Sequence, residues 1–155
     1  MQPPTDPSWD LYPQTILEFE TDAERVRIDL REVVPQALAA RLAQIRPGVA
    51  FGIVTSDNPH GRPRPAGENE DGRRALAREL EARGVFYLPA DGVSPDGSHR
   101  EQGFAAWLDL EDARRIAREY GQSAFFWFDG RAFRIEGGAV EAPPQVLPID
   151  PVPGG

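Results

Sequence analysis

The chain of 155 residues is 40% hydrophobic and has a net charge of -8, and each of its 17 basic residues is an arginine. This length and composition predict one globular domain with a sizeable core. The negative charge disfavours nucleic acid and anionic membranes as partners. The absence of lysine excludes Schiff-base chemistry, and the absence of cysteine excludes disulfides and thiolate metal sites.

The two ends of the chain differ in composition from its middle. Residues 1–8 contain three prolines and no apolar pattern, which predicts a flexible N-terminal arm. Residues 138–155 contain five prolines and predict an extended or disordered tail, which leaves residues 9–137 as the single domain. No apolar run approaches the ~20 residues that cross a bilayer, and the N-terminus lacks the features of a secretion signal, so we expect a cytoplasmic protein.

The N-terminal part of the domain has a strand pattern followed by a helix pattern. Residues 15–20 and 26–30 alternate apolar and polar side chains around the turn at 21–24, and this predicts a β-hairpin. Residues 33–45 repeat apolar side chains every three or four positions, which is typical of an amphipathic helix, and residues 46–48 end it.

The remaining elements alternate between strands and helices. The wholly apolar segment 50–55 is typical of a central strand buried on both faces. A polar loop then leads into a helix with Asn69 before it, and Asp109 is expected to cap a second helix. The expected order is strand 50–55, loop 56–67, helix 69–83, strand 85–89, loop 90–100, strand 102–108, helix 109–120, strand 123–128 and strand 132–136.

This order predicts an α+β fold with a ferredoxin-like split βαβ arrangement. We expect a four-stranded antiparallel sheet with helices on one face, in addition to the N-terminal hairpin and helix. In that topology the first two strands end at the edge where the last two begin. Residues 56–69, residues 91–101 and Gln122 should therefore meet at one edge of the sheet.

The sequence resembles a bacterial domain-of-unknown-function family, number 3293. The residues that carry the resemblance are the segments SWDLYPQTILEF, FGIVTSDNP, EQGFAAWLD and GQSAFFWFDG, together with Asn69 before its helix. The resemblance implies a soluble bacterial protein and brings no activity, ligand or catalytic residue. Ser56-Asp57 departs from the pattern, because a small residue and an aromatic are expected before Asn-Pro. The residues shared with the family at the predicted edge are Asn58, Asn69, Glu101 and Gln122.

These four polar residues, with Arg62 and Arg73 near the start of the helix, form the candidate ligand site. Arginine side chains beside free helix N–H groups suit an anionic ligand. Each residue also has a structural interpretation, since Asn58 could form a turn with Pro59 and Asn69 could cap the helix. Glu101 and Gln122 could likewise bridge the two loops to one another.

Two histidines, His60 and His99, lie in the two loops expected to face one another. With Glu101 they could serve acid–base chemistry, but their spacing matches no metal signature, so no metal site or cofactor is predicted. Three classes of function remain. The first is binding of a small polar or anionic molecule at this edge, the second is interaction with a protein partner, and the third is an enzyme that uses Glu101 with His60 or His99.

Overall fold

The computed structural model describes Asp6 and residues 9–149. Its centre is one antiparallel sheet of eight strands in the order β2-β1-β4-β5-β3-β6-β7-β8. The strands are β1 Ile16–Glu20, β2 Arg25–Asp29, β3 Phe51–Val54, β4 Tyr87–Val93, β5 Arg100–Ala106, β6 Ala124–Phe128, β7 Phe133–Gly137 and β8 Gln145–Val146. The helices are α1 Gln36–Ile45, α2 Ala66–Ala82 and α3 Leu110–Glu119, and the 3-10 helices are η1 Trp9–Gln14 and η2 Pro59–Gly61.

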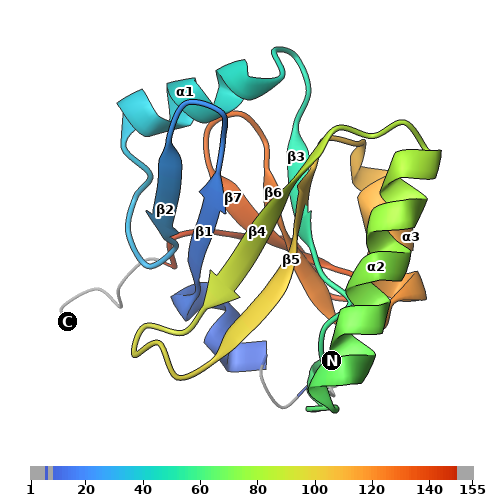
Figure 1. Ribbon diagram of the computed structural model, residues 1–155. Coiled ribbons are helices and arrows are strands. Elements are labelled where there is room, and N and C mark those ends of the chain that lie inside the picture. Colours follow the sequence, from blue (N-terminus) through green and yellow to red (C-terminus); the bar gives the residue numbers. More distant parts are fainter. Residues whose placement is uncertain (1–5, 7–8, 150–155) are drawn as a thin grey trace, which may run out of the picture.

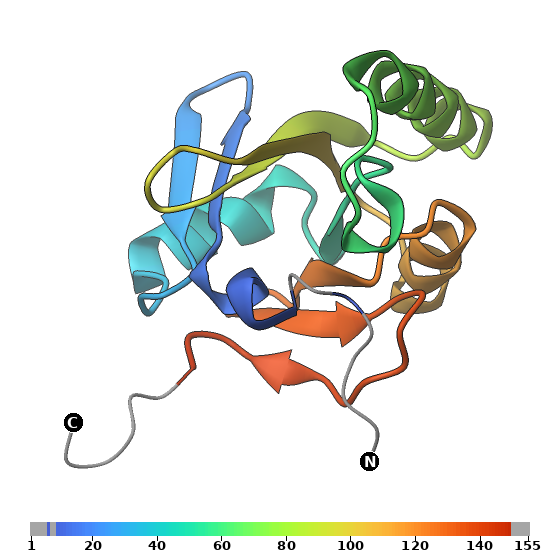
Figure 2. The ribbon, with the colours of Figure 1, turned by 90° about the horizontal axis from the view of Figure 1, so that it is seen from below.

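The sheet curls into a half-barrel (Figure 1). The curl is clearest in Figure 2, where the molecule is seen from below. The predicted hairpin forms as β1 and β2, and its turn is closed because the Thr21 hydroxyl accepts the backbone N–H of Ala23 and of Glu24. The hairpin does not stand apart, since β1 pairs with β4 and so continues the main sheet.

Alternation along β3 divides the core into two layers. Phe51 and Ile53 point into the concave side of the sheet, whereas Gly52 and Val54 face α2 and α3. A Cβ on Gly52 would lie 3.4 Å from the Trp127 ring, so the outer layer packs closely against the strand there. The outer layer is completed by Leu76, Leu80, Ala113 and Ile116.

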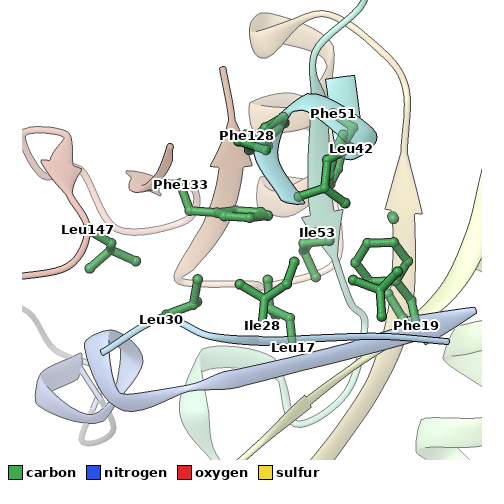
Figure 3. Close-up of a cluster of buried hydrophobic side chains, with 14 of the residues drawn as sticks. Leu17, Phe19, Ile28, Leu30, Leu42, Phe51, Ile53, Phe128, Phe133 and Leu147 are labelled. Atoms are coloured by element: carbon green, nitrogen blue, oxygen red, sulfur yellow. The ribbon is translucent and has the colours of Figure 1, made fainter. Parts of the chain in front are cut away.

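The concave layer combines phenylalanine rings with leucine and isoleucine side chains, as Figure 3 shows. The ring centroid of Phe51 lies 4.6 Å from that of Trp107 and 5.2 Å from that of Phe128. Leu42 of α1 packs into the same layer. The N-terminal helix was expected in addition to the four-stranded sheet, and it forms as α1, where it helps to fill the interior created by the curl of the sheet.

The expected α+β class with an antiparallel sheet is confirmed, but the expected four-stranded sheet is too small. Strands β4, β5, β3 and β6 do lie side by side in that order. Strands β1 and β2 extend the sheet beyond β4, and β7 and β8 extend it beyond β6. A ferredoxin-like sheet is not confirmed, since the strands continue past both of its expected edges and curl.

Two local features bear on the remaining expectations. Asp109 caps α3, because its carboxylate accepts the backbone N–H of Asp112 at 2.8 Å, as predicted. Beyond residue 137, β8 pairs with β7 and Leu147 is buried in the concave layer, so the packed core continues into the segment expected to be a tail. Within the described residues, no helix is both long and apolar enough to cross a membrane.

Candidate functional site

Three loops that are distant in sequence meet at the lower end of the sheet in Figure 1. They follow β3, connect β4 to β5, and precede β6. The backbone N–H of Thr55 donates to the Gln122 side chain at 3.1 Å, and the Asn58 amide lies 3.4 Å from Glu101. The segments 56–69, 91–101 and 122 are thus neighbours, and their contacts decide what each residue can do.

Asn58 and Asn69 form a reciprocal pair that we call the asparagine clasp. The Asn58 backbone N–H donates to Asn69 Oδ1 at 3.0 Å, and Asn69 Nδ2 donates to Asn58 Oδ1 at 3.0 Å. Asn69 lies inside α2, which begins at Ala66, so its expected role as the helix cap is wrong. The clasp instead holds the loop after β3 against the helix.

The clasp also fixes the side chain of Arg64. Its Nε donates to Asn69 Oδ1 at 2.6 Å, and its Nη2 donates to the carbonyl of Ser56 at 2.7 Å. Its backbone N–H donates to Asn58 Oδ1. Among the described residues, Nη1 of Arg64 has no hydrogen-bond partner. The guanidinium is therefore held in place with one nitrogen left for another group.

The other arginines expected to face a ligand are placed differently. Arg73 donates to both carboxylate oxygens of Asp57, at 2.9 and 3.1 Å, and the Gln102 backbone N–H donates to the same carboxylate. Asp57 is buried, so this ion pair joins α2 to the end of the sheet. Arg62 is exposed and no side-chain contact is recorded for it in the described structure.

Gln122 completes the hydrogen bonding at the end of β3. Its Oε1 accepts the backbone N–H of Thr55, and its Nε2 donates to the carbonyl of Ile53 at 3.4 Å. The side chain therefore replaces a strand at a point where β6 has not yet begun. Buried backbone groups need such partners. This structural role explains why Gln122 is present, and it does not require a ligand.

Glu101 is half-buried on the concave side of the same edge. Burial raises the pKa of its carboxyl, while the neighbouring His99 and the Asn58 amide act in the opposite direction. His99 Nε2 lies 3.4 Å from Glu101 Oε1. Nearby, the Tyr12 hydroxyl donates to Asp6, and burial raises the pKa of that hydroxyl. Among the described residues, no group of three or more histidine or acidic side chains could hold a metal ion.

A cleft of about 290 Å³ lies between η2, α2 and the end of α3, and Glu101 and His99 do not line it. Its walls carry three basic side chains, His60, Arg64 and Arg118, and one acidic side chain, Glu119. Ser56 and Gly72 also line this cleft. We call it the arginine cleft.

Ser56 is the least expected member of the cleft. It is 1% exposed, and within the described part of the chain its hydroxyl has no hydrogen-bond partner. A buried polar group without a partner costs about 1–3 kcal/mol. A partner from outside the protein, either water or a ligand, would remove that cost.

Gly72 makes room for this arrangement. A Cβ at this position would lie 2.6 Å from Arg64 Nη2 and 2.9 Å from the Ser56 hydroxyl. Glycine in the middle of a helix costs about 1 kcal/mol relative to alanine, so a glycine here needs a reason. The close approach of Arg64 and Ser56 supplies it.

Residues 54–125 match the family "Protein of unknown function (DUF3293)". This confirms the resemblance in the sequence. The matched segment runs from the end of β3 into β6, so it contains the asparagine clasp and every residue named above as lining the arginine cleft. No curated protein and no solved structure matches the chain.

Among the described residues, the non-glycine residues with left-handed backbone are Asn58 and His60, and both lie in the DUF3293 segment. Asn58 has φ 47° and His60 has φ 60°, on either side of Pro59. Such conformations cost of order 1–3 kcal/mol each and persist where the surroundings impose them. Here the clasp holds Asn58, and the backbone N–H of His60 donates to the carbonyl of Gly121 at 2.6 Å. The strain places the His60 ring at the wall of the cleft.

The sequence predicted which loops meet at this edge, but it did not predict the arginine cleft. It singled out Asn58 and Asn69, which support Arg64, and it missed Ser56, Arg118 and Gly121. A signal was present in Gly72, a glycine inside a helical pattern. Arg118 had no local signal, because only the packing of α3 beside α2 brings it to the same cleft.

Proposed function

We propose that the protein binds a small anionic molecule in the arginine cleft. The observation that carries the proposal is the held guanidinium of Arg64 beside the buried Ser56 hydroxyl, where neither Arg64 Nη1 nor that hydroxyl has a hydrogen-bond partner among the described residues. In this proposal the residues matched to DUF3293 form a split βαβ unit. The loops after β3 and before β6 supply residues of its binding site.

Pre-organisation of Arg64 favours binding. A free arginine side chain loses rotamer freedom when it grips a ligand, and this ordering costs about 0.5–1.5 kcal/mol. The bonds to Asn69 and to the Ser56 carbonyl have already met that cost in the folded protein. Asn58 and Asn69 thus remain in the proposed site as residues that position Arg64.

Local charge also favours an anion. The chain as a whole is acidic, with a net charge of -8, so a cleft that gathers two guanidinium groups is unlike the average surface. Arg118 Nε donates to the carbonyl of Gly138 at 3.1 Å, which directs this exposed side chain across the end of α3. Glu119 offsets part of this charge, so both arginines are needed for a net attraction.

In this proposal three of the other residues expected to bind the ligand have structural roles instead. Glu101 and Gln122 hold the loops of the edge together, and Arg73 forms the ion pair with Asp57. In the proposal Arg62 is an outer contact of the ligand, because it is exposed and directly follows η2, which lines the cleft. The test for it is the same titration with an Arg62→Gln variant.

The experiment is calorimetric titration of the whole chain with inorganic phosphate and with acetate at low ionic strength. We expect binding of at least one anion, with a loss of at least ~5-fold in affinity in Arg118→Gln, because bonds between charged groups contribute about 1.5–3 kcal/mol. Arg115→Gln is the matched control, since Arg115 lies on α3 and pairs with Asp112 away from the cleft. No binding of either anion would refute the proposal.

A second candidate function, interaction with a protein partner, is favoured by the edge strand β8. Val146 and Ile149 are 66% and 42% exposed, and a hollow of about 440 Å³ beside them is lined by Trp9 and Arg31 among others. A partner strand could pair with the free edge of β8. Val146→Asp should then abolish capture of that partner and leave anion binding unchanged.

A further inference from the structure

The bonds already made by the two arginines restrict how an anion can approach them in the cleft. Arg64 uses Nε and Nη2 on protein acceptors, and Arg118 uses Nε on the carbonyl of Gly138. Carboxylates and phosphates both pair with arginine through two parallel N–H···O bonds. In Arg64 the protein already uses Nε and Nη2, which are the two nitrogens of one side of the guanidinium group. In Arg118 it uses Nε alone.

The remaining donors come from separate elements of the fold. Arg64 lies in the loop before α2, Arg118 in the last turn of α3, and the Ser56 hydroxyl just after β3. Donors on three different elements suit a group whose oxygens point in three directions. A planar carboxylate has two oxygens, whereas a phosphate ester presents three acceptor oxygens and a charge of about -1.5 to -2 at neutral pH.

We infer that the ligand of the arginine cleft is a small phosphate monoester, whose phosphate binds between Arg64 and Arg118 and accepts a hydrogen bond from the Ser56 hydroxyl. This inference rests on the proposed anion site and specifies its ligand class. A monoester also carries more negative charge than a carboxylate, which strengthens its attraction to the two guanidinium groups in spite of the opposing charge of Glu119.

The walls and the volume of the cleft restrict the organic part of the ester. Pro59 and Tyr120 line the cleft, and the Tyr120 hydroxyl donates to Glu79 at 3.1 Å. Burial and Glu79 raise the pKa of that hydroxyl to about 12, so the ring stays neutral and can contact a short carbon chain. Because the volume of about 290 Å³ is at the lower limit for ligand pockets, ~300–1,000 Å³, a group of a few carbons fits better than a nucleoside.

The test uses three probes on the full chain: methyl phosphate, acetate and adenosine monophosphate. Calorimetric titration at low ionic strength should give methyl phosphate at least ~10-fold tighter binding than acetate, as expected for one additional charge-assisted bond worth about 1.4 kcal/mol. Adenosine monophosphate should bind no more tightly than methyl phosphate.

The Ser56→Ala variant tests the hydroxyl. It removes a buried group that has no hydrogen-bond partner in the described part of the chain, so the variant should fold as well as the natural protein does, which thermal unfolding will check. Its affinity for methyl phosphate should fall by ~5-fold or more, and its affinity for acetate should change less. Ser98→Ala, in the exposed loop between β4 and β5, is the control and should change neither.

The outcomes separate the inference from the proposal on which it rests. If acetate binds as tightly as methyl phosphate and both need Arg118, the anion site stands and the phosphate monoester is refuted. If methyl phosphate binds but Ser56→Ala has no effect on its affinity, the assigned role of the hydroxyl is wrong. If neither probe binds, both the site and its ligand class are refuted.

Discussion

Asn69 holds the guanidinium of Arg64 from inside a helix, with Arg64 Nε donating to Asn69 Oδ1 at 2.6 Å. The same oxygen accepts the backbone N–H of Asn58, so one side chain fixes both the loop and the arginine. The proposed ligand site thus depends on a residue that does not line the cleft itself.

Substitution of Asn69 should therefore weaken binding without touching the ligand. Asn69→Leu removes both acceptor bonds, and we expect the free energy of unfolding to fall by about 1–3 kcal/mol and anion affinity to fall at least ~5-fold. Asn69→Asp keeps the acceptor for Arg64 and should retain more of the affinity than Asn69→Leu. Chemical denaturation and calorimetry check this, and equal affinities for the two variants would contradict the positioning role.

Two glycines of α2 provide a matched test of the cleft. A Cβ on Gly72 would meet Arg64 and Ser56 at 2.6 and 2.9 Å, whereas a Cβ on Gly67 would meet nothing within 4 Å. Gly67→Ala should raise stability by about 0.5–1 kcal/mol through helix propensity and leave binding unchanged. Gly72→Ala should abolish anion binding, while its gain in propensity offsets part of the cost of displacing Arg64. Normal affinity in Gly72→Ala would show that the ligand binds elsewhere.

The buried carboxylate of Glu136 should be a main determinant of stability. Arg114 Nη2 donates to it at 2.9 Å, and Arg134 Nε lies 2.5 Å away without hydrogen-bond geometry. Glu136→Ala removes the carboxylate partner of Arg134 and leaves Arg114 with Glu111, and we expect a loss of about 3–5 kcal/mol in the free energy of unfolding. Glu111, whose side chain is 74% exposed, also pairs with Arg114 and is the control. Glu111→Ala should cost less than about 1 kcal/mol, so similar losses for the two variants would refute this account.

The pH dependence of stability should distinguish Glu101 from Asp29. Burial raises the pKa of Glu101, so its contribution to folding is complete below the ordinary glutamate pKa and is lost as pH rises through the higher value in the folded protein. Glu101→Gln should therefore be more stable than the natural protein at pH 7, and this gain should disappear towards pH 4.

Asp29 has the opposite sign. The hydrogen bond from Arg31 lowers its pKa, so its contribution is present above the ordinary aspartate pKa and is lost as pH falls through the lower value. Asp29→Asn should be less stable at pH 7 and equal to the natural protein at low pH. Thermal unfolding over this range checks both variants, and the same direction of change in both would contradict these assignments.

Local patterns predicted most of the elements but not the extent of the sheet. The alternation in 15–20 and 26–30, the apolar run at 50–55 and the Asp109 cap all depend on neighbours in sequence, and each appears in the structure. The pairing of β1 with β4 depends on contacts between residues more than 70 positions apart, for which no local pattern exists. The curl, and the placement of α1 inside it, follow from that pairing.

The candidate site divides in the same way. Topology predicted which loops meet, and the Asn58 to Glu101 contact agrees with it. Which side chains of these loops face the cleft could not be predicted, since Arg73 is paired with the buried Asp57 whereas Arg64 is held by the clasp. Only the side-chain packing of α2 and α3 distinguishes the arginine that can bind a ligand from the one that stabilises the fold.

The most direct measurement is a titration of the isotopically labelled chain with methyl phosphate, followed by the amide resonances of the protein. The account predicts progressive, saturable shifts centred on Ser56, Arg64, Gly72 and Gly121, and their loss in Gly72→Ala. Saturable shifts centred on β8 or on Glu101, or no shifts at all, would contradict the claim that the arginine cleft is the binding site.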